Sequence, residues 1–317
     1  MSDLRKLRLR QGVREDTPAI VARLNDTFRT PIDGPTWEWY AFGNPNGPSR
    51  IYVAESDEDP VAGVVAFSPI FLRIENNRVC SDYAHHLALK PAYRDTFSYL
   101  ALMQYALKAE AALGVKLAIG PPNRTAYPIH KKLTKWVEFG SLQRMRKLSP
   151  LVGEHDCRQR SSFPESFDMF YERVSRGLAF CLEKNATWMN WRFCGRPESP
   201  YTVYTTGPED AWTGYIILKR WQEESGYRKA HIIDLHAVDE AAFQELMKAA
   251  ESYADGYGEV NLWAVQGYPY RRWLEAWGFT TTPADHQPLL ARPFNAFMPV
   301  FPEGDCCLSY GDGDSQY

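Results

Sequence analysis

The sequence predicts an α/β protein made of two similar units, each a mixed, mostly antiparallel twisted sheet flanked by helices. Three observations lead to this prediction. A chain of 317 residues is long enough for about two domains. Its two halves repeat one order of aromatic, strand-like and helix-like segments. The matched positions lie 143 residues (Trp136 and Phe279) to 152 residues (Trp39 and Trp191) apart, a period that indicates a duplicated domain rather than a solenoid.

In the first half, apolar spacing and turn residues predict the order β-α-α-β-β-β-α-β-α-β. The clearest helix, 97–114, places Met103, Ala106 and Leu107 on one face and ends at Gly114. Strands are predicted at 4–13, 51–56, 61–74, 79–89, 115–120 and 137–148, and the other helices at 15–28, 35–45 and 125–133.

The second half repeats this core. Strands are predicted at 199–206, 212–218, 230–238 and 259–265, and helices at 240–258 and 270–279. Residues 149–166 are polar and aperiodic, which predicts a linker and hence two domains, 1–150 and 151–317. The tail after Pro293 is predicted to be irregular, with a solvated acidic end, GDGDSQY.

Bulk properties limit the partners. A net charge of −3 and a pI near 6.2 argue against a nucleic-acid partner. The six cysteines lack the spacing of a metal or redox site, so we expect no metal and free thiols in a reducing compartment. The start of the chain lacks the apolar core of a signal peptide, and no apolar run is long enough to cross a membrane. We expect a cytoplasmic monomer or homodimer that binds a small molecule, away from membranes.

Two segments carry a resemblance to a known family. The run PAYRDTFSYLALMQYAL after a long strand, and the stretch from SRIYVAE to PNRTAYPIHKKLTKW, resemble the GNAT superfamily of acyl-CoA-dependent N-acyltransferases, in particular its bacterial tandem type. The resemblance implies acyl transfer to a small amine or amino acid in a cleft of the N-terminal domain. It also implies that acyl-CoA contacts five residues, which are Leu87, Leu89, Arg94, Asn123 and Tyr127.

One turn departs from the family pattern P-x-Y-R-G-x-G-x-x-x-x-L. Pro91, Tyr93 and Arg94 align, but Asp95 and Phe97 stand where the two glycines belong. A carboxylate about 4 Å from a phosphate costs roughly 4 kcal/mol at an effective dielectric near 20, so we expect Asp95 either to turn toward solvent or to cap the following helix. Binding of acetyl-CoA or another acyl-CoA is therefore left open. The second copy has neither arginine nor glycine at this turn, and we expect no acyl-CoA there.

The candidate catalytic residues are Asp82, His85, His86 and His130. Strand alternation places Asp82 and His86 on one face and His85 on the other. Asp82 or a histidine would act as base, and Asp82 could instead orient the His86 ring. His130 occupies the position of the family's acidic tyrosine, and the resemblance implies that it protonates the leaving thiolate. A zinc site at the histidine pair lacks a recognisable third ligand.

Three functional hypotheses follow. The first is N-acyl transfer. The second is a CoA-independent GNAT-fold lyase, decarboxylase or hydrolase acting on a small carboxylate or amino acid. The third is a non-catalytic binding protein, which predicts exposed and mutually distant histidines. Most of the aromatic residues on the short helices are expected to be core; the set is Trp37, Trp39, Phe42, Trp188, Trp191 and Phe193. Asp234 and His236 of the second copy are expected to be structural.

Overall fold

The computed structural model describes residues 7–28, 31–297 and 305–312. The chain divides into two compact units, neither of which is one continuous stretch. Unit 1 comprises residues 1–71, 79–139 and 289–299, and unit 2 comprises residues 72–78, 140–288 and 300–317. No helix of the described residues has the length and apolar character needed to span a membrane.

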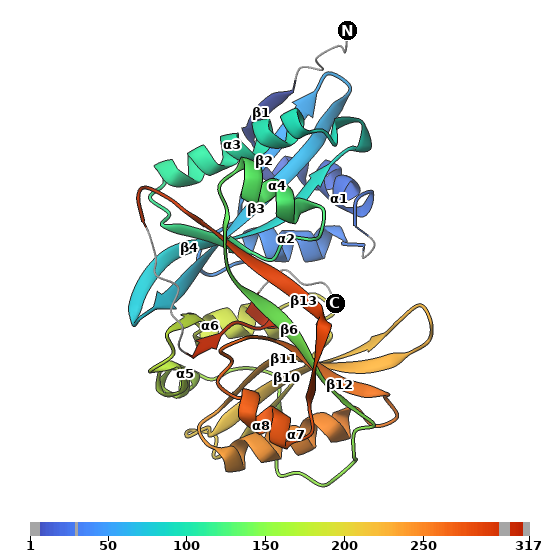
Figure 1. Cartoon of the computed structure of the whole chain (residues 1–317), viewed down its shortest axis with the longest axis vertical. Helices are drawn as coiled ribbons and strands as arrows, with labels where there is room; N and C mark the ends of the chain where they lie inside the picture. Colours follow the sequence, from blue (N-terminus) through green and yellow to red (C-terminus); the bar gives the residue numbers. More distant parts are fainter. Residues whose placement is uncertain (1–6, 29–30, 298–304, 313–317) are drawn as a thin grey trace. The chain divides into compact units, whose positions relative to one another are not determined.

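The first copy has the predicted element order, in which 3-10 turns are the only additions (Figure 1). Residues 4–6 of the predicted first strand lie outside the described residues. The elements are β1 (Arg8–Gln11), α1 (Thr17–Asn25), α2 (Gly34–Phe42), β2 (Arg50–Ser56), β3 (Asp59–Ile74), β4 (Asn77–Leu89), α3 (Thr96–Ala112), β5 (Leu117–Gly120), α4 (Ala126–Leu133) and β6 (Val137–Leu148).

The second copy repeats the core of this order. Its elements are β7 (Arg158–Arg160), α5 (Phe167–Ser175), β8 (Phe180–Leu182), α6 (Ala186–Met189), a π-helical turn (Asn190–Cys194), β9 (Tyr201–Thr206), β10 (Gly214–Gln222), β11 (Arg228–Ala237), α7 (Glu240–Tyr253), β12 (Glu259–Val265), α8 (Arg271–Ala276), β13 (Thr280–Pro293) and β14 (Cys306–Cys307). The predicted linker is wrong in part, because its residues 158–160 form β7, which pairs with β9.

An equivalent glycine and leucine lie close together within each copy. A Cβ built on Gly63 of β3 would lie 3.4 Å from Leu102 of α3, and one built on Gly214 of β10 would lie 2.8 Å from Leu246 of α7. Both leucines are fully buried. At Gly63 a side chain is excluded mainly by Leu89 of β4, 2.5 Å from the Cβ position, whereas at Gly214 the bare backbone lets the long helix approach the sheet. These are two of the residue pairs that matched in the sequence, so the duplication extends to side-chain packing.

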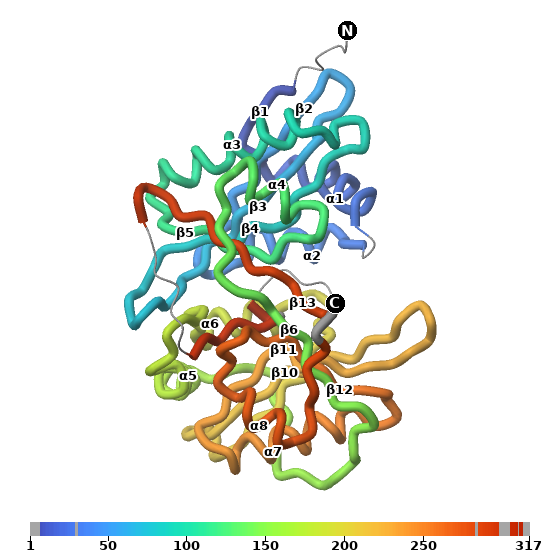
Figure 2. The backbone as a smooth tube through the Cα atoms, viewed as in Figure 1, coloured from blue at the N-terminus to red at the C-terminus, as the bar shows by residue number. Residues whose placement is uncertain are grey.

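Each unit completes its sheet with a strand from the other copy. In unit 1, β5 pairs in parallel with β4 and antiparallel with β13, the last long strand of the second copy. In unit 2, β12 pairs in parallel with β11 and antiparallel with β6, the last strand of the first copy. Figure 2 traces these two exchanged strands, β6 in green and β13 in red. The division into domains 1–150 and 151–317 remains a prediction.

Two cores position the candidate site of unit 1. The first lies between the sheet and α3, around Phe67, Leu102 and Met103. The second lies between the sheet and α1 and α2, around Ile20, Trp37 and Val64. Alternation along β3 sends Val65 and Phe67 to the first core and Val64 and Ala66 to the second. Of the six aromatic residues expected mostly in the core, Trp37, Trp188 and Phe193 are buried, whereas Trp39, Phe42 and Trp191 are only partly buried.

Candidate functional site

Strand β4 changes character at His86. The parallel ladder to β5 pairs Ser81, Asp82 and Tyr83, and its last pair is at Tyr83, three residues before His86. The backbone of His86 has a φ of 51°, in the left-handed region. Few residues other than glycine adopt this region, although histidine does so more often than most. A backbone irregularity of this kind changes the direction of the side chain, and strained backbone is found more often at functional sites than elsewhere. The predicted alternation, which separates His85 from His86, is therefore wrong.

The two imidazoles lie against each other on the face covered by α2. The Nδ1 atoms of His85 and His86 are 2.5 Å apart. The ring centroid of Tyr40 lies 4.8 Å from that of His85, and the ring centroid of Trp37 lies 5.3 Å from that of His86. Both histidines are buried. The rings of Trp37 and Tyr40 thus pack against the two histidines.

The histidine pair continues into a chain of hydrogen bonds. His85 Nε2 lies 2.7 Å from Ser68 Oγ, which lies 2.6 Å from Ser49 Oγ. A hydroxyl and a neutral imidazole can each donate at one atom and accept at another, so the chain is consistent with protons ordered in either direction. Burial and the neighbouring His86 hold the pKa of His85 well below its usual value. His85 is therefore neutral at pH 7.

Asp82 lies elsewhere, beneath α3. Its carboxylate pairs with Arg50 of β2, and Arg50 Nε donates to Glu110 of α3 at 2.7 Å. Tyr52 donates to the other oxygen of Glu110, also at 2.7 Å. Burial and the nearby Glu110 raise the pKa of Asp82. The predicted Asp82–His86 orienting pair is wrong, because Asp82 pairs with Arg50 while the Nδ1 of His86 faces His85.

His130 forms a third, separate cluster. Its Nδ1 lies 2.7 Å from the Tyr99 hydroxyl, which lies 3.1 Å from the Thr134 hydroxyl, and its ring packs on Trp136. Burial lowers the pKa of His130 to about 4. The ring is neutral at pH 7, so it can donate a proton only from a neutral N–H.

The start of α3 is closed by Asp95. Its Oδ1 accepts from the backbone N–H groups of Phe97 at 2.9 Å and of Ser98 at 3.0 Å. These hydrogen bonds hold the pKa of Asp95 below its usual value. Of the two predicted outcomes, the capping one is therefore observed. Phe97 is 77% exposed, and Arg94 Nε donates to the Leu89 carbonyl. As it stands, this helix end does not fit the diphosphate of a coenzyme A.

The other predicted coenzyme contacts are placed as follows. Leu87 and Leu89 of β4 pack against the α3 core. Asn123 accepts from the Ala126 N–H and caps α4, while the hydroxyl of Tyr127 donates to Glu138. Leu87, Leu89 and Tyr127 pack against the same core, and Arg94 donates to the Leu89 carbonyl. Contact of these residues with a coenzyme stays a prediction.

In the second copy, the residues equivalent to the Asp82–His86 strand are enclosed by the end of the chain. Lys184 Nζ lies 2.8 Å from Asp234 and 2.8 Å from Asp312. The Ser309 N–H donates to Asp312, and Cys307 lies beside His236. The described part of the acidic tail is therefore buried rather than solvated, because Asp312 pairs with a buried ammonium. Residues 313–317 of that tail lie outside the described residues.

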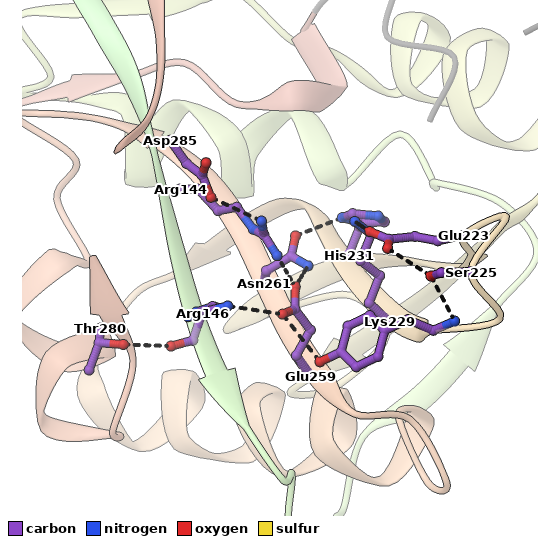
Figure 3. Close-up of polar contacts among 11 residues, drawn as sticks. Arg144, Arg146, Glu223, Ser225, Lys229, His231, Glu259, Asn261, Thr280 and Asp285 are labelled. Carbon is purple, nitrogen blue, oxygen red and sulfur yellow. Dashed lines mark hydrogen bonds and ion pairs between the residues drawn. The ribbon is translucent and has the colours of Figure 1, made fainter. Parts of the chain in front are cut away.

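A further polar network crosses the sheet of unit 2 (Figure 3). Arg144 of β6 pairs with Glu259 of β12, Asn261 donates to the same carboxylate, and His231 of β11 faces Asn261. Among the described residues, no group of three or more histidine, cysteine, aspartate or glutamate side chains could hold a metal ion.

Several of these residues were missed from the sequence. Arg50 and Ser68 lie in strands that look like ordinary apolar segments, and Ser49 lies just before the first of these strands. Glu110 left a signal, because it falls on the buried face of α3 one turn after Ala106, where a carboxylate needs a partner. Lys184 and Asp312 lie in segments without periodicity, and nothing local predicted that they pair.

No family model and no curated protein matches the sequence. Solved structures do match. A protein of unknown function from Enterococcus faecalis V583, described as a probable N-acyltransferase, is 14% identical with a TM-score of 0.70, over 91% of this chain and 73% of its own. A GCN5-related N-acetyltransferase from Anabaena variabilis is 16% identical with a TM-score of 0.68, over the same shares.

A eukaryotic enzyme shares the architecture. Saccharomyces cerevisiae N-myristoyltransferase, solved with bound myristoyl-CoA, is 8% identical with a TM-score of 0.67, over 93% of this chain and 81% of its own. The chain has the fold of the GCN5-related N-acetyltransferases, and the resemblance drawn from its residues is confirmed at the level of the fold. Activity has to be argued from the site.

Proposed function

We propose that the chain is a GNAT-fold N-acyltransferase that takes a small amine or amino acid as acceptor at strand β4 of unit 1. The observation that carries the proposal is the buried pair of His85 and His86, held together at the point where β4 leaves its ladder with β5. A neutral imidazole can accept a proton, and the burial that lowers the pKa of His85 makes it a weaker base than a free histidine. Structural relatives described as N-acyltransferases support the reaction class.

The residues of the chain supply a proton path. An acceptor ammonium must lose a proton before its nitrogen can attack an acyl carbon. The His85–His86 pair accepts that proton, and the hydrogen bonds to Ser68 and Ser49 allow the charge to be shared along the chain. Asp82 is held by Arg50 away from this path, so its role is structural in the proposal. The role of His130 as proton donor stays a prediction.

The acyl donor is the part that fits least. Acetyl-CoA or another acyl-CoA is implied by the fold, but Asp95 already takes the N–H groups that a diphosphate would use. No step is therefore routed through the coenzyme. The Asp95→Gly/Phe97→Gly double variant isolates this point, because opening the helix end should create or strengthen coenzyme affinity if the cap alone prevents it.

The activity test uses purified protein, a set of acyl thioesters and a set of small amines and amino acids. Replacing His85 or His86 by Gln should lower kcat about a hundredfold or more, the usual contribution of a positioned acid or base. His286→Ala is the control, because that side chain is exposed on β13. Full activity in both variants, or no acyl transfer by the wild-type protein to any acceptor, would reject the proposal.

The second candidate is CoA-independent lyase, decarboxylase or hydrolase chemistry on a small carboxylate or amino acid. The Asp95 cap favours it, and so does the order Ser68–His85–His86, in which a hydroxyl meets an imidazole oriented by a third group. Calorimetry with acetyl-CoA separates the two candidates. Micromolar binding favours acyl transfer, and no heat at millimolar ligand favours the second. The non-catalytic hypothesis predicted distant, exposed histidines, which His85 and His86 are not.

A further inference from the structure

Unit 2 contains a buried lysine without an acidic partner. Lys219 of β10 is 6% exposed. Among the described residues, no carboxylate lies within ion-pair distance of the Lys219 ammonium. Its Nζ lies over the Trp221 ring, 5.3 Å from the ring centroid. Lys184, equally buried, is held by two carboxylates. A cation–π contact offsets only part of the cost of burying an ammonium.

The charged groups that act on Lys219 are also cationic. Burial comes first, followed by Arg196, which lies just after the π-helical turn, and Arg192 within it, and together they lower the pKa of Lys219 to about 8. Near neutral pH the ammonium is still the main form. Lys219 and these two arginines repel one another, so an anion placed beside Lys219 would be stabilised.

His231, whose ring lacks a hydrogen-bond partner at one nitrogen among the described residues, lies directly opposite Lys219 on the neighbouring strand. Lys219 pairs with His231 of β11 in the antiparallel register, so their side chains share one face about 5 Å apart at Cβ. His231 is 8% exposed, and its Nε2 is buried without a hydrogen-bond partner. Lys219 and His231 are therefore neighbours on one face of the sheet, and among the described residues the Nε2 of His231 has no hydrogen-bond partner.

The tautomer of His231 is set by its neighbours. Its Nδ1 lies 2.7 Å from Asn261 Oδ1, and the Asn261 amide is oriented because its Nδ2 donates to Glu259. Figure 3 shows His231, Asn261 and Glu259 in this order. An amide oxygen only accepts, so His231 Nδ1 carries the proton and Nε2 keeps its lone pair. Burial lowers the pKa of His231 to about 4, so the ring stays neutral.

We propose that Lys219 and His231 form a binding site for a small oxyanion that carries an O–H beside its charge, such as a 2-hydroxycarboxylate or hydrogen phosphate. The Lys219 ammonium would pair with the anionic oxygen, and the ligand O–H would donate to His231 Nε2. An amino acid fits less well, because its ammonium would meet the cationic surroundings of Lys219. The site lies in the copy that the proposed acyl transfer does not use and is independent of that reaction.

The binding test is calorimetry of the full chain with glycolate, acetate and inorganic phosphate. Acetate matches glycolate but lacks the hydroxyl. Glycolate or phosphate should bind wild-type protein at least tenfold more tightly than acetate, and Lys219→Met and His231→Phe should each weaken that binding at least tenfold. Lys229→Met is the control, because it removes the same charge two residues from His231 but from a lysine paired with Glu223.

The stability of the same variants tests the site independently of ligand binding. Without ligand, Lys219→Met should raise the midpoint of urea denaturation, since it removes an unpaired buried charge, whereas Lys184→Met should lower it. Saturating glycolate or phosphate should raise the wild-type midpoint and leave that of Lys219→Met unchanged. The proposal is overturned if neither anion binds the wild-type protein at millimolar concentration, if Lys219→Met binds as the wild type does, or if acetate binds as tightly as glycolate.

Discussion

Asp95 and Asp239 occupy the same position in the two copies. Each is the residue before the long helix of its copy, and each accepts from a backbone N–H in the first turn, Asp95 from Ser98 at 3.0 Å and Asp239 from Ala242 at 2.8 Å. The second copy, which shows no trace of a phosphate-binding turn, thus uses the same device as the first. This agreement indicates that the helix end of the first copy is built for capping.

Replacing either aspartate by alanine should lower the free energy of unfolding by about 1 kcal/mol, because one cap is lost. Asp95→Asn should retain most of the stability, since asparagine caps nearly as well. Because the folded pKa of Asp95 is depressed, the advantage of aspartate over asparagine is complete above the unfolded pKa and disappears as the pH falls through the folded value. Urea denaturation at several pH values measures both effects. Equal stability of wild-type and Asp95→Ala protein would contradict the cap.

At the scale of elements, three parts of unit 1 are joined by one arginine. Arg50 of β2 reaches Asp82 of β4 and Glu110 of α3, so the strand that carries His85 and His86 is fixed relative to the helix behind it. Removing one partner of a buried ion network leaves uncompensated charge, which costs far more than the net contribution of the intact network.

Arg50→Met should therefore destabilise the protein by about 3–5 kcal/mol. The triple variant Arg50→Met/Asp82→Asn/Glu110→Gln should recover much of this loss, because the stranded charges are gone. Arg73→Met is the control, since its partner Glu172 is half exposed, and it should cost less than about 1 kcal/mol. Chemical denaturation compares the three variants. Similar losses in the free energy of unfolding for Arg50→Met and Arg73→Met would contradict the prediction that Arg50 compensates buried charges.

At the scale of the whole molecule, the exchange of β6 and β13 ties the two copies together. The edge of β5 is covered by Leu290, Ala291 and Arg292 of β13, which follow the predicted domain boundary by more than a hundred residues. An uncovered strand edge presents unpaired N–H and C=O groups and favours aggregation.

A fragment ending at residue 150 lacks β13, so we expect it to be insoluble or to lack cooperative unfolding. Expressing residues 1–150 and 151–317 together should recover soluble complex, because each fragment supplies the strand that the other needs. Solubility and thermal unfolding of the separate and combined fragments test this. A monomeric, cooperatively folded 1–150 fragment would show that the exchange is dispensable.

The sequence alone determined the order of the elements in the first copy, because apolar periodicity, caps and turn residues are local properties of the chain. In the second copy it missed α5 and the strands β7, β8, β13 and β14. It also determined the duplication, since Gly63 and Gly214 are kept at matching positions in the two copies. Only the tertiary structure decided which ionisable groups meet. His85 and His86, which alternation separates, lie together beside the positive φ of His86, Asp82 pairs with Arg50 instead, and Lys184 pairs with Asp312 in the interior. Such pairings depend on strand irregularities and long-range contacts, whose energy belongs to the folded molecule rather than to any segment of it.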